Sequence, residues 1–206
     1  MPIVFDLVGQ QWQRKLIVLA VIVVGVFLIV ASEPVSPEGS LWHEAVERSG
    51  VLCILIGIIG RTWCSMYIGG NKLNMLVTDG PYSVTRNPLY LFSTIAAFGV
   101  GAQIGSIVFA IVCAAATVAI FAVVVNHEER ALADRFPDEF ALYRARVPRF
   151  MPNICQYQDA ETILVRPSRV HQTFRDALLF LLAVPGVKAL DGLREAGLIE
   201  PLFRLY

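Results

Sequence analysis

The stretch LYLFSTIAAFGVGAQIGSIVFAIVCAAATVAIFAVVV, residues 89–125, contains no charged side chain over 37 positions. A run of about 18 uncharged apolar residues is long enough for one transmembrane helix. A single helix of this whole run, at ~1.5 Å per residue, would be nearly twice as long as the ~30 Å hydrocarbon core of a bilayer. The run therefore predicts two spans, about 88–103 and 105–126, and the glycines of GVGAQIGS (99–106) supply the turn between them.

Two further apolar segments precede this pair of spans. The sequence predicts a span over about 15–32 rather than a cleaved signal peptide, because no small-residue cleavage site follows it. Another span is expected over about 48–70, interrupted by Arg61. With 56% hydrophobic residues in a chain of 206, the sequence indicates the all-α class and a single integral membrane domain over 1–206. The expected architecture is a polytopic helix bundle with four to five transmembrane helices.

The charges of the loops predict the orientation of the chain. EPVSPEGSLWHEAVER (33–48) carries four glutamates and one arginine, whereas the 71–88 loop contains Lys72 and Arg86 and the region 127–175 contains eight arginines. Positively charged residues favour the cytoplasmic side of a membrane. We therefore expect the N-terminus, the 71–88 loop and the region 127–175 in the cytoplasm, with a cytoplasmic helical segment toward the C-terminus.

The segment 174–190 near the C-terminus leaves three structures open. It is apolar but short, and it contains Pro185 and Lys188. A fifth span, a re-entrant helix and an amphipathic helix at the membrane interface all fit this pattern.

Cysteine spacing and overall charge exclude other kinds of site. The four cysteines, Cys53, Cys64, Cys113 and Cys155, lack a metal-like pairing, so no metal site is predicted, and those within predicted spans favour small apolar roles. The net charge of zero gives no reason to expect a nucleic-acid partner.

A polar segment, GPYSVTRNPLY (80–90), precedes the hairpin of spans, and a second one follows it at 126–152. Asn87 and Pro88 suit the start of a helix, and a helix N-terminus also offers free N–H groups to an anion. Arg86 begins one span and Glu128-Glu129 end the next, so a hairpin brings them together unless Arg86 is only a positive anchor and the glutamates only a solvated helix end. One arginine, two carboxylates and a helix N-terminus suit a zwitterionic ligand with an α-amino acid group.

Aromatic residues and Arg61 each allow two interpretations. Tyr82, Tyr90 and Tyr143 fit interfacial anchors, and they fit equally the walls of a pocket that stack on a planar ligand or cover a cation. Arg61, inside a predicted span, costs ~2.5–3.5 kcal/mol at the centre of a bilayer. It therefore either snorkels to the surface or pairs inside the bundle, with Glu128 or Glu129 as its candidate partner.

Leu132, Phe136, Phe140 and Tyr143 recur at helical spacing after the last of these spans, although Pro137 interrupts the pattern. We expect these apolar side chains to pack the helix that follows the span onto the bundle.

These motifs, in this order, resemble the superfamily of isoprenylcysteine carboxyl methyltransferases and phospholipid methyltransferases. The resemblance covers residues 55–152 and consists of GPY (80–82), RNPLY (86–90), the double span, the Glu pair (128–129) and VPR (147–149). The chain has Asn87 where the prenylcysteine enzymes usually have histidine, which fits the phospholipid and bacterial branches. It also has Pro137 where a glycine often follows the phenylalanine.

The resemblance implies a membrane methyltransferase that binds S-adenosyl-L-methionine at the cytoplasmic face, in the regions 78–90 and 126–152. It implies a lipid or lipidated substrate reached from the bilayer, with Arg86 and Glu129 as catalytic residues. For a chain of this branch we expect a bacterial inner membrane. The residues expected at the cofactor are Tyr82, Arg86, Asn87, Pro88, Tyr90, Glu128, Glu129 and Tyr143.

Two alternatives remain. One is an NADPH-dependent reductase of the sterol type, whose C-terminal half has a similar R-H-P-x-Y region but whose chains are normally longer. The other is a small membrane scaffold without enzymatic activity, in which Arg86 and Glu129 form only a structural ion pair.

Overall fold

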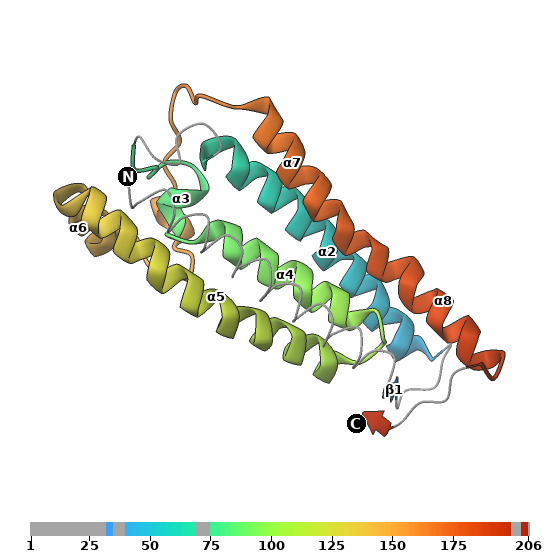
Figure 1. Ribbon diagram of the computed structural model, residues 1–206. Helices are drawn as coiled ribbons and strands as arrows, with labels where there is room; N and C mark the ends of the chain where they lie inside the picture. Colours follow the sequence, from blue (N-terminus) through green and yellow to red (C-terminus); the bar gives the residue numbers. More distant parts are fainter. Residues whose placement is uncertain (1–31, 35–39, 69–74, 199–202, 206) are drawn as a thin grey trace, which may run out of the picture.

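The computed structural model describes residues 32–34, 40–68, 75–198 and 203–205, and these form a bundle of helices (Figure 1). The predicted all-α class is confirmed, since the described strands are one parallel pair of three residues each. The helices are α2 (Leu41–Ile68), α3 (Pro81–Val84), α4 (Pro88–Ala102), α5 (Ile107–Arg135), α6 (Pro137–Arg146), α7 (Pro167–Leu178) and α8 (Ala183–Glu195). Short 3-10 helices η1 (Ile154–Gln156) and η2 (Leu179–Leu182) and strands β1 (Ser32–Pro34) and β2 (Phe203–Leu205) complete the description.

Two of the described helices, α2 and α5, are long and apolar enough to cross a membrane by length and composition. Helix α2 covers the span expected over 48–70 as far as Ile68. Helix α5 covers the span expected over 105–126 from Ile107 onward. The span expected over 15–32 lies outside the described residues except for Ser32, which begins β1. Helix α4 matches the expected 88–103 closely, but its 15 residues extend only about 22 Å, less than the ~30 Å hydrocarbon core.

Helices α4 and α5 form the predicted hairpin, and their turn is tighter than the sequence indicated. The turn comprises residues 103–106, where Gly105 has a φ of 72°, a conformation that favours glycine. The Ser106 hydroxyl caps α5 by accepting a hydrogen bond from the Phe109 N–H at 3.3 Å. Gly99 and Gly101, assigned to the turn from sequence, are instead helical and lie at helix contacts.

Helices α2 and α4 pack along a seam of small residues, which we call the glycine seam: Gly50, Gly57 and Gly60 of α2 with Ala96 and Gly99 of α4. A Cβ added to Gly57 would lie 2.5 Å from the Ala96 Cβ, and one added to Gly99 would lie 2.5 Å from the Gly50 carbonyl oxygen. Small residues of this kind let helix backbones approach closely in membranes. The seam therefore holds α4, and the site at its N-terminal end, in a fixed position on α2.

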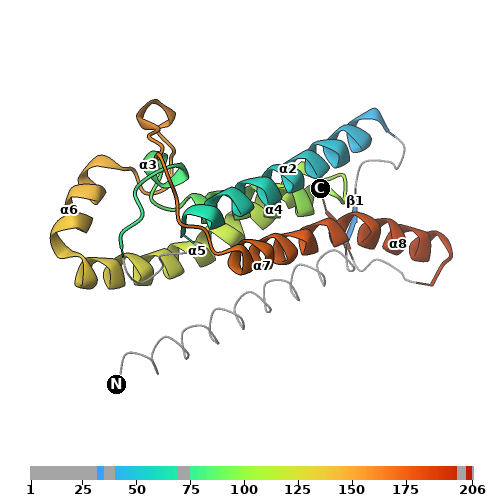
Figure 2. The ribbon, with the colours of Figure 1, turned by 90° about the horizontal axis from the view of Figure 1, so that it is seen from above.

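The C-terminal helices run beside α2 in the opposite direction (Figures 1 and 2). Ala177 of α7 is buried and packs in one cluster with Ile54 and Ile58 of α2. The segment 174–190 thus belongs to a longer helical rod, Pro167 to Glu195, with η2 in its middle. The rod follows the bundle rather than lying across its end, and the fifth span, the re-entrant helix and the interfacial helix all stay predictions.

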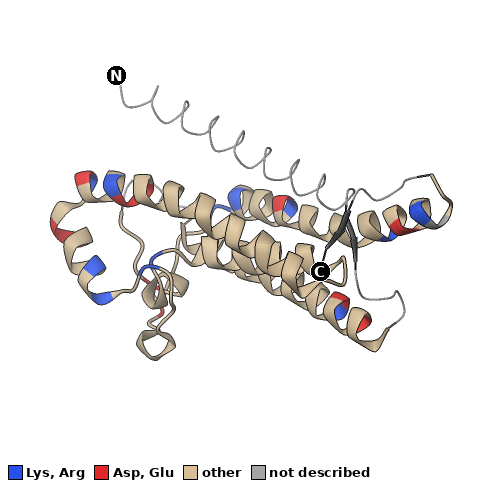
Figure 3. Cartoon of the chain, turned by 90° about the horizontal axis from the view of Figure 1, so that it is seen from below, with Lys and Arg blue, Asp and Glu red and all other residues tan. Residues whose placement is uncertain are grey.

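Apart from Arg61, charged side chains gather toward the ends of α2 and α5 (Figure 3). The apolar part of α5, up to Val125, carries none, and its charges begin at Glu128. Helix α7 differs, because it carries charged residues along its length. The arrangement agrees with a helical membrane bundle whose polar site lies at the end formed by α3, α6 and the start of α4.

Candidate functional site

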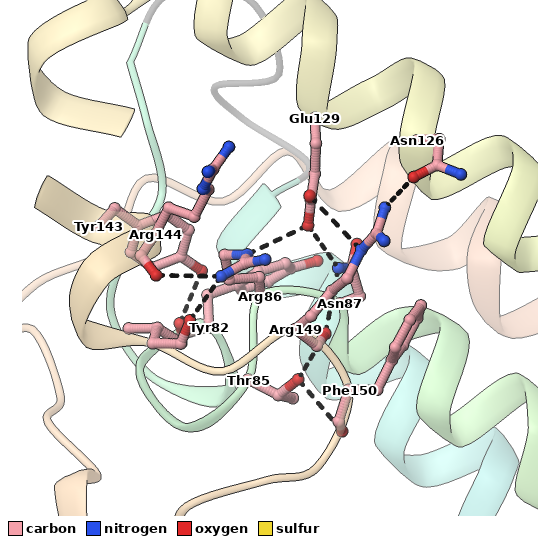
Figure 4. A network of polar contacts seen from close by, with 11 residues as sticks. Tyr82, Thr85, Arg86, Asn87, Asn126, Glu129, Tyr143, Arg144, Arg149 and Phe150 are labelled. Carbon is pink, nitrogen blue, oxygen red and sulfur yellow. Dashed lines mark hydrogen bonds and ion pairs between the residues drawn. The ribbon is translucent and has the colours of Figure 1, made fainter. Parts of the chain in front are cut away.

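The polar segments 80–90 and 126–152 meet at one end of the bundle (Figure 4). The link between α3 and α4 runs beside the segment that follows α6, and the Arg86 N–H donates to the Pro148 carbonyl at 2.9 Å. The Thr85 hydroxyl donates to the Arg149 carbonyl at 3.1 Å. The site is therefore held by hydrogen bonds to backbone carbonyls between segments more than 60 residues apart in the chain.

Arg86 joins three elements of the site. Its Nε donates to Glu129 Oε1 of α5 at 3.1 Å, and its Nη1 donates to the carbonyl oxygens of Val147 at 2.8 Å and Arg144 at 3.2 Å. These carbonyls belong to the C-terminal end of α6, where the last C=O groups of a helix lack intrahelical partners and favour a cation. Arg86 thus caps α6 and binds α5 at once.

Glu129 lies between two guanidinium groups. Its Oε2 is 3.4 Å from Arg149 Nε, and its Oε1 also accepts a hydrogen bond from Asn87 Nδ2 at 3.3 Å. The Glu129 side chain is only 16% exposed. A carboxylate this poorly hydrated is stabilised by two cations and an amide donor. The sequence prediction that Arg86 and Glu129 meet is confirmed.

Asn87 occupies the N-cap position of α4, with Pro88 as the first helical residue, as the sequence predicts. Its side chain, however, makes no capping hydrogen bond. The Asn87 Nδ2 instead donates to the Arg149 carbonyl at 3.1 Å and to Glu129. The predicted helix start at Asn87-Pro88 is therefore confirmed, while the carboxylate and carbonyl acceptors hold the Asn87 amide in the site.

Glu128 has a different partner from its neighbour. Its Oε2 accepts a hydrogen bond from the Tyr90 hydroxyl at 2.8 Å. The two glutamates lie inside α5, which continues to Arg135, so the interpretation as a solvated helix end is wrong. Consecutive residues of a helix point about 100° apart, which explains why the two carboxylates contact different groups.

The three predicted tyrosines are buried, so they are not surface anchors. Tyr90 packs against Phe121 with ring centroids 4.5 Å apart, and the Tyr143 hydroxyl donates to the Tyr82 carbonyl at 2.8 Å. Burial raises the pKa of the Tyr82 and Tyr143 hydroxyls above the usual tyrosine value. The Tyr82 hydroxyl oxygen itself is buried without a hydrogen-bond partner in the part of the chain that the structure describes. Their stacking on a ligand stays a prediction.

The expected packing of the helix after α5 is confirmed with one change. Phe140 and Tyr143 form a buried cluster with Val147, and Leu132 and Phe136 pack against it. Helix α5 ends at Arg135 and α6 begins at Pro137, so the cluster is shared by two helices rather than one.

Arg61 points into the bundle. It donates a hydrogen bond to the Ser93 hydroxyl of α4, and its guanidinium carbon lies 5.9 Å from the centroid of the Phe180 ring in η2. Its pairing with Glu128 or Glu129 stays a prediction.

Sequence reasoning extended the site only to residue 152 and missed that the segment after it also holds the site. We call residues 149–165, between α6 and α7, the strap. Gly80 N–H donates to the Gln158 carbonyl at 2.7 Å, and Asn153 N–H donates to the Val84 carbonyl at 2.9 Å. Pro148 and Pro152 signal the break after α6, but backbone pairing with α3 leaves no mark in side-chain type.

Two hollows occur near this end of the described chain. One, of about 530 Å³, is lined by Ser168, His171, Phe174 and Arg175 of α7, and another, of about 180 Å³, is lined by Arg146, Cys155, Gln156, Tyr157 and Gln158. Both lie outside the Arg86–Glu129 network, whose polar groups are already engaged with one another.

Comparison with known proteins supports the resemblance. The family model for phospholipid methyltransferases matches residues 48–139. The chain is 33% identical to the protein-S-isoprenylcysteine O-methyltransferase of Schizosaccharomyces pombe over 84 residues, which are 41% of this chain and 36% of that protein.

Two bacterial relatives match over most of their length. The cobalt-zinc-cadmium resistance protein CzcN of Cupriavidus metallidurans is 36% identical over 168 residues, 82% of this chain and 77% of that protein. The nickel-cobalt-cadmium resistance protein NccN of Alcaligenes xylosoxydans xylosoxydans is 34% identical over 176 residues, 85% of this chain and 82% of that protein. No solved structure matches significantly.

Proposed function

Because the chain belongs to the superfamily of isoprenylcysteine and phospholipid methyltransferases, a family of membrane methyltransferases, we propose that it uses S-adenosyl-L-methionine to methylate the head group of an amphiphilic lipid or lipidated substrate. The observation that carries the proposal is the meeting of Arg86, Asn87, Glu129 and Arg149 at one end of a membrane bundle. These residues come from three motifs of the family resemblance, RNPLY, the Glu pair and VPR.

The charges of the site fit a cofactor that carries an α-amino acid group. Glu128 and Glu129 offer carboxylates to an ammonium group, while Arg86 and Arg149 offer N–H donors to a carboxylate. The buried Tyr82 hydroxyl supplies a donor that has no acceptor among the described residues. Arg86 already binds Glu129 and two carbonyls, so we assign it first to positioning the wall of the site and second to ligand contact.

The chemistry places modest demands on the protein. Bound S-adenosyl-L-methionine supplies a methyl group on a sulfonium, and methyl transfer is an in-line displacement that depends on alignment and a desolvated nucleophile. For a carboxylate acceptor, Arg86 or Arg61 would hold the head group. For an amine acceptor, Glu129 would accept its proton or stabilise its charge. In both cases the acceptor keeps its apolar tail in the bilayer.

Equilibrium binding of radiolabelled S-adenosyl-L-methionine to the full chain in lipid nanodiscs tests the proposal. We expect saturable binding that Glu129→Gln and Arg86→Ala each weaken at least about tenfold, a loss of about 1.4 kcal/mol. Arg144→Ala is the matched control, because Arg86 contacts only the backbone carbonyl of residue 144. Saturable binding of NADPH instead would support the reductase alternative, and binding of neither would support the scaffold.

The acceptor and the orientation need separate measurements. Incubation with membrane lipid extracts and the radiolabelled methyl donor should label a lipid fraction in the wild type and not in Glu129→Gln. We also propose a bacterial inner membrane, with the N-terminus and the site in the cytoplasm, from the loop charges. The same argument puts the acidic segment 33–48 outside. A thiol reagent that does not cross the membrane should therefore, in intact cells, modify a single cysteine at Glu38 and not one at Asp138.

The printed names of two relatives motivate a physiological proposal. We propose that methylation by this chain supports resistance to metals such as cobalt and cadmium, because CzcN and NccN are named as resistance proteins for these metals. A deletion strain should grow less at raised cadmium or cobalt concentrations. Complementation by the wild type but not by Glu129→Gln would tie that tolerance to the site, whereas equal complementation would separate them.

A further inference from the structure

The strap exposes large apolar side chains. Met151 is 82% exposed, Ile154 is 76% exposed and Leu164 is 67% exposed, and Ile163 and Val165 are also exposed. Each Å² of apolar surface left in water costs about 25 cal/mol relative to burial. Exposed apolar surface that is concentrated on one short segment marks a contact with another phase or partner.

The strap lies at the depth where α2 leaves its apolar stretch. The Tyr157 ring of the strap lies 6.2 Å from Trp63, and the Asp159 carboxylate accepts a hydrogen bond from the Tyr67 hydroxyl at 2.6 Å. Trp63 and Tyr67 occupy the last two turns of α2, a helix apolar enough to span a membrane. These contacts hold the strap at the end of the apolar stretch of α2, where we expect the boundary between hydrocarbon and head groups.

The strap also projects in the direction expected of a segment that lies along the membrane surface. In Figures 2 and 3 the segment between α6 and α7 extends sideways from the bundle rather than along the helix axes. In a membrane crossed by α2 and α5, a sideways projection at this depth runs within the plane of the interface.

Charges beside the strap suit anionic lipids. Arg146 precedes it, Arg166 and Arg169 follow it, and all three are exposed. Arginine side chains near a membrane surface extend toward the head groups, and each adds about 1 kcal/mol of attraction to an anionic leaflet. Of the two acidic residues in the strap, Asp159 is already bonded to Tyr67 and Tyr157.

We infer that the strap is an interfacial membrane anchor: its apolar side chains insert at the boundary between head groups and acyl chains, and the flanking arginines contact the phosphates of anionic lipids. Since the strap pairs with Gly80 and Val84 of the site wall, this anchor connects the composition of the bilayer to the geometry of the site. The inference does not depend on the methyltransferase proposal.

Spin labelling of the native Cys155, which is exposed beside Ile154, tests the anchor directly. The full chain carries Cys53→Ala, Cys64→Ala and Cys113→Ala, and collisions with apolar oxygen and with a polar nickel complex are compared in nanodiscs. We expect a severalfold shift toward oxygen at residue 155 relative to a label at Asp138→Cys, in α6, with Cys155→Ser. Equal access of the nickel complex at both positions would overturn the inference.

Further experiments distinguish lipid contact from contact with another protein at the strap. Met151→Glu with Ile154→Glu should move the label toward the nickel complex while α-helical circular dichroism is retained. Protection from both reagents would mean that a second protein copy covers the strap, which would overturn the inference. The label should lie deeper in nanodiscs that contain phosphatidylglycerol than in nanodiscs of phosphatidylcholine alone. Equal depth would overturn the proposed contact between the arginines and the phosphates of anionic lipids.

Discussion

Arg86 Nε lies 3.1 Å from Glu129 Oε1, an ion pair between residues 43 positions apart that closes the open end of the α4–α5 hairpin. Because the same guanidinium also holds the carbonyls at the end of α6, one side chain fixes the relative positions of three helices. The pair therefore combines a structural role with the electrostatics of the site. Its two roles can be separated by measuring stability and ligand binding on the same variants.

Arg86→Lys should destabilise the chain even though it keeps the positive charge. A lysine ammonium cannot reproduce the fork that reaches a carboxylate and two carbonyls together. Removing one partner of a largely buried pair costs about 3 kcal/mol, and Arg86→Lys should cost less than this because the charge is kept. We expect a lower melting temperature in detergent and a clear coupling energy in a double-mutant cycle with Glu129→Gln. Additive effects of the two substitutions would show that the pair contributes little to stability.

Tyr143→Phe should lower stability at neutral pH by about 1 kcal/mol, because it removes the buried bond to the Tyr82 carbonyl. Burial raises the pKa of the Tyr143 hydroxyl, so the folded chain favours its protonated form. The resulting stabilisation is complete below the ordinary tyrosine pKa of about 10 and is lost as the pH rises above it. As the pH is raised past about 10, the melting temperature of Tyr143→Phe should fall less steeply than that of the wild type. Parallel curves would contradict this assignment.

Asp159→Asn should loosen the strap. The hydrogen bond from Tyr67 lowers the pKa of the Asp159 carboxyl, so its contribution is present above the usual aspartate pKa of about 3.9 and is lost as the pH falls further. We expect faster amide hydrogen exchange at Gly80 and Asn153, whose N–H groups pair across the strap and α3. Glu161→Gln, a nearby exposed carboxylate, serves as the control and should leave both rates unchanged.

Gly57→Ala should disrupt the glycine seam, because the new Cβ would lie 2.5 Å from the Ala96 Cβ. Overpacking of this kind costs about 1–3 kcal/mol. Adding Ala96→Gly removes the clashing atom and should recover part of the lost melting temperature. Gly186→Ala places its Cβ in open space and should cost nothing. Equal effects at both glycines would point to helix propensity instead of packing.

The hairpin and the Arg86–Glu129 contact were predictable because both depend on the length of one uncharged run. Once 37 residues must fold into two antiparallel helices, the residues flanking the run meet at the same end. The turn was harder to locate. Gly99 and Gly105 are the same residue type, so the sequence does not tell them apart. Only the contact with α2 shows that Gly99 packs within a helix, whereas Gly105 forms the turn.

Other parts of the site carried no such pattern. Arg149 appeared in a motif, but its contact with Glu129 depends on the path of the chain after α6. Asn87 was predicted at the start of α4, but the two acceptors of its side chain come from segments far away in the sequence, which a local pattern does not reveal. The strap holds α3 largely through backbone groups, which every residue type provides equally.

The glycine seam restricts how an amphiphile can approach the site. Along Gly50, Gly57 and Ala96, the backbones of α2 and α4 touch so closely that not even a methyl group can be added at the glycines. A hydrocarbon tail, several ångströms wide, therefore cannot slide between these two helices. A lipid that delivers its head group to Glu129 would therefore have to pass along a flank of the bundle other than the one between α2 and α4.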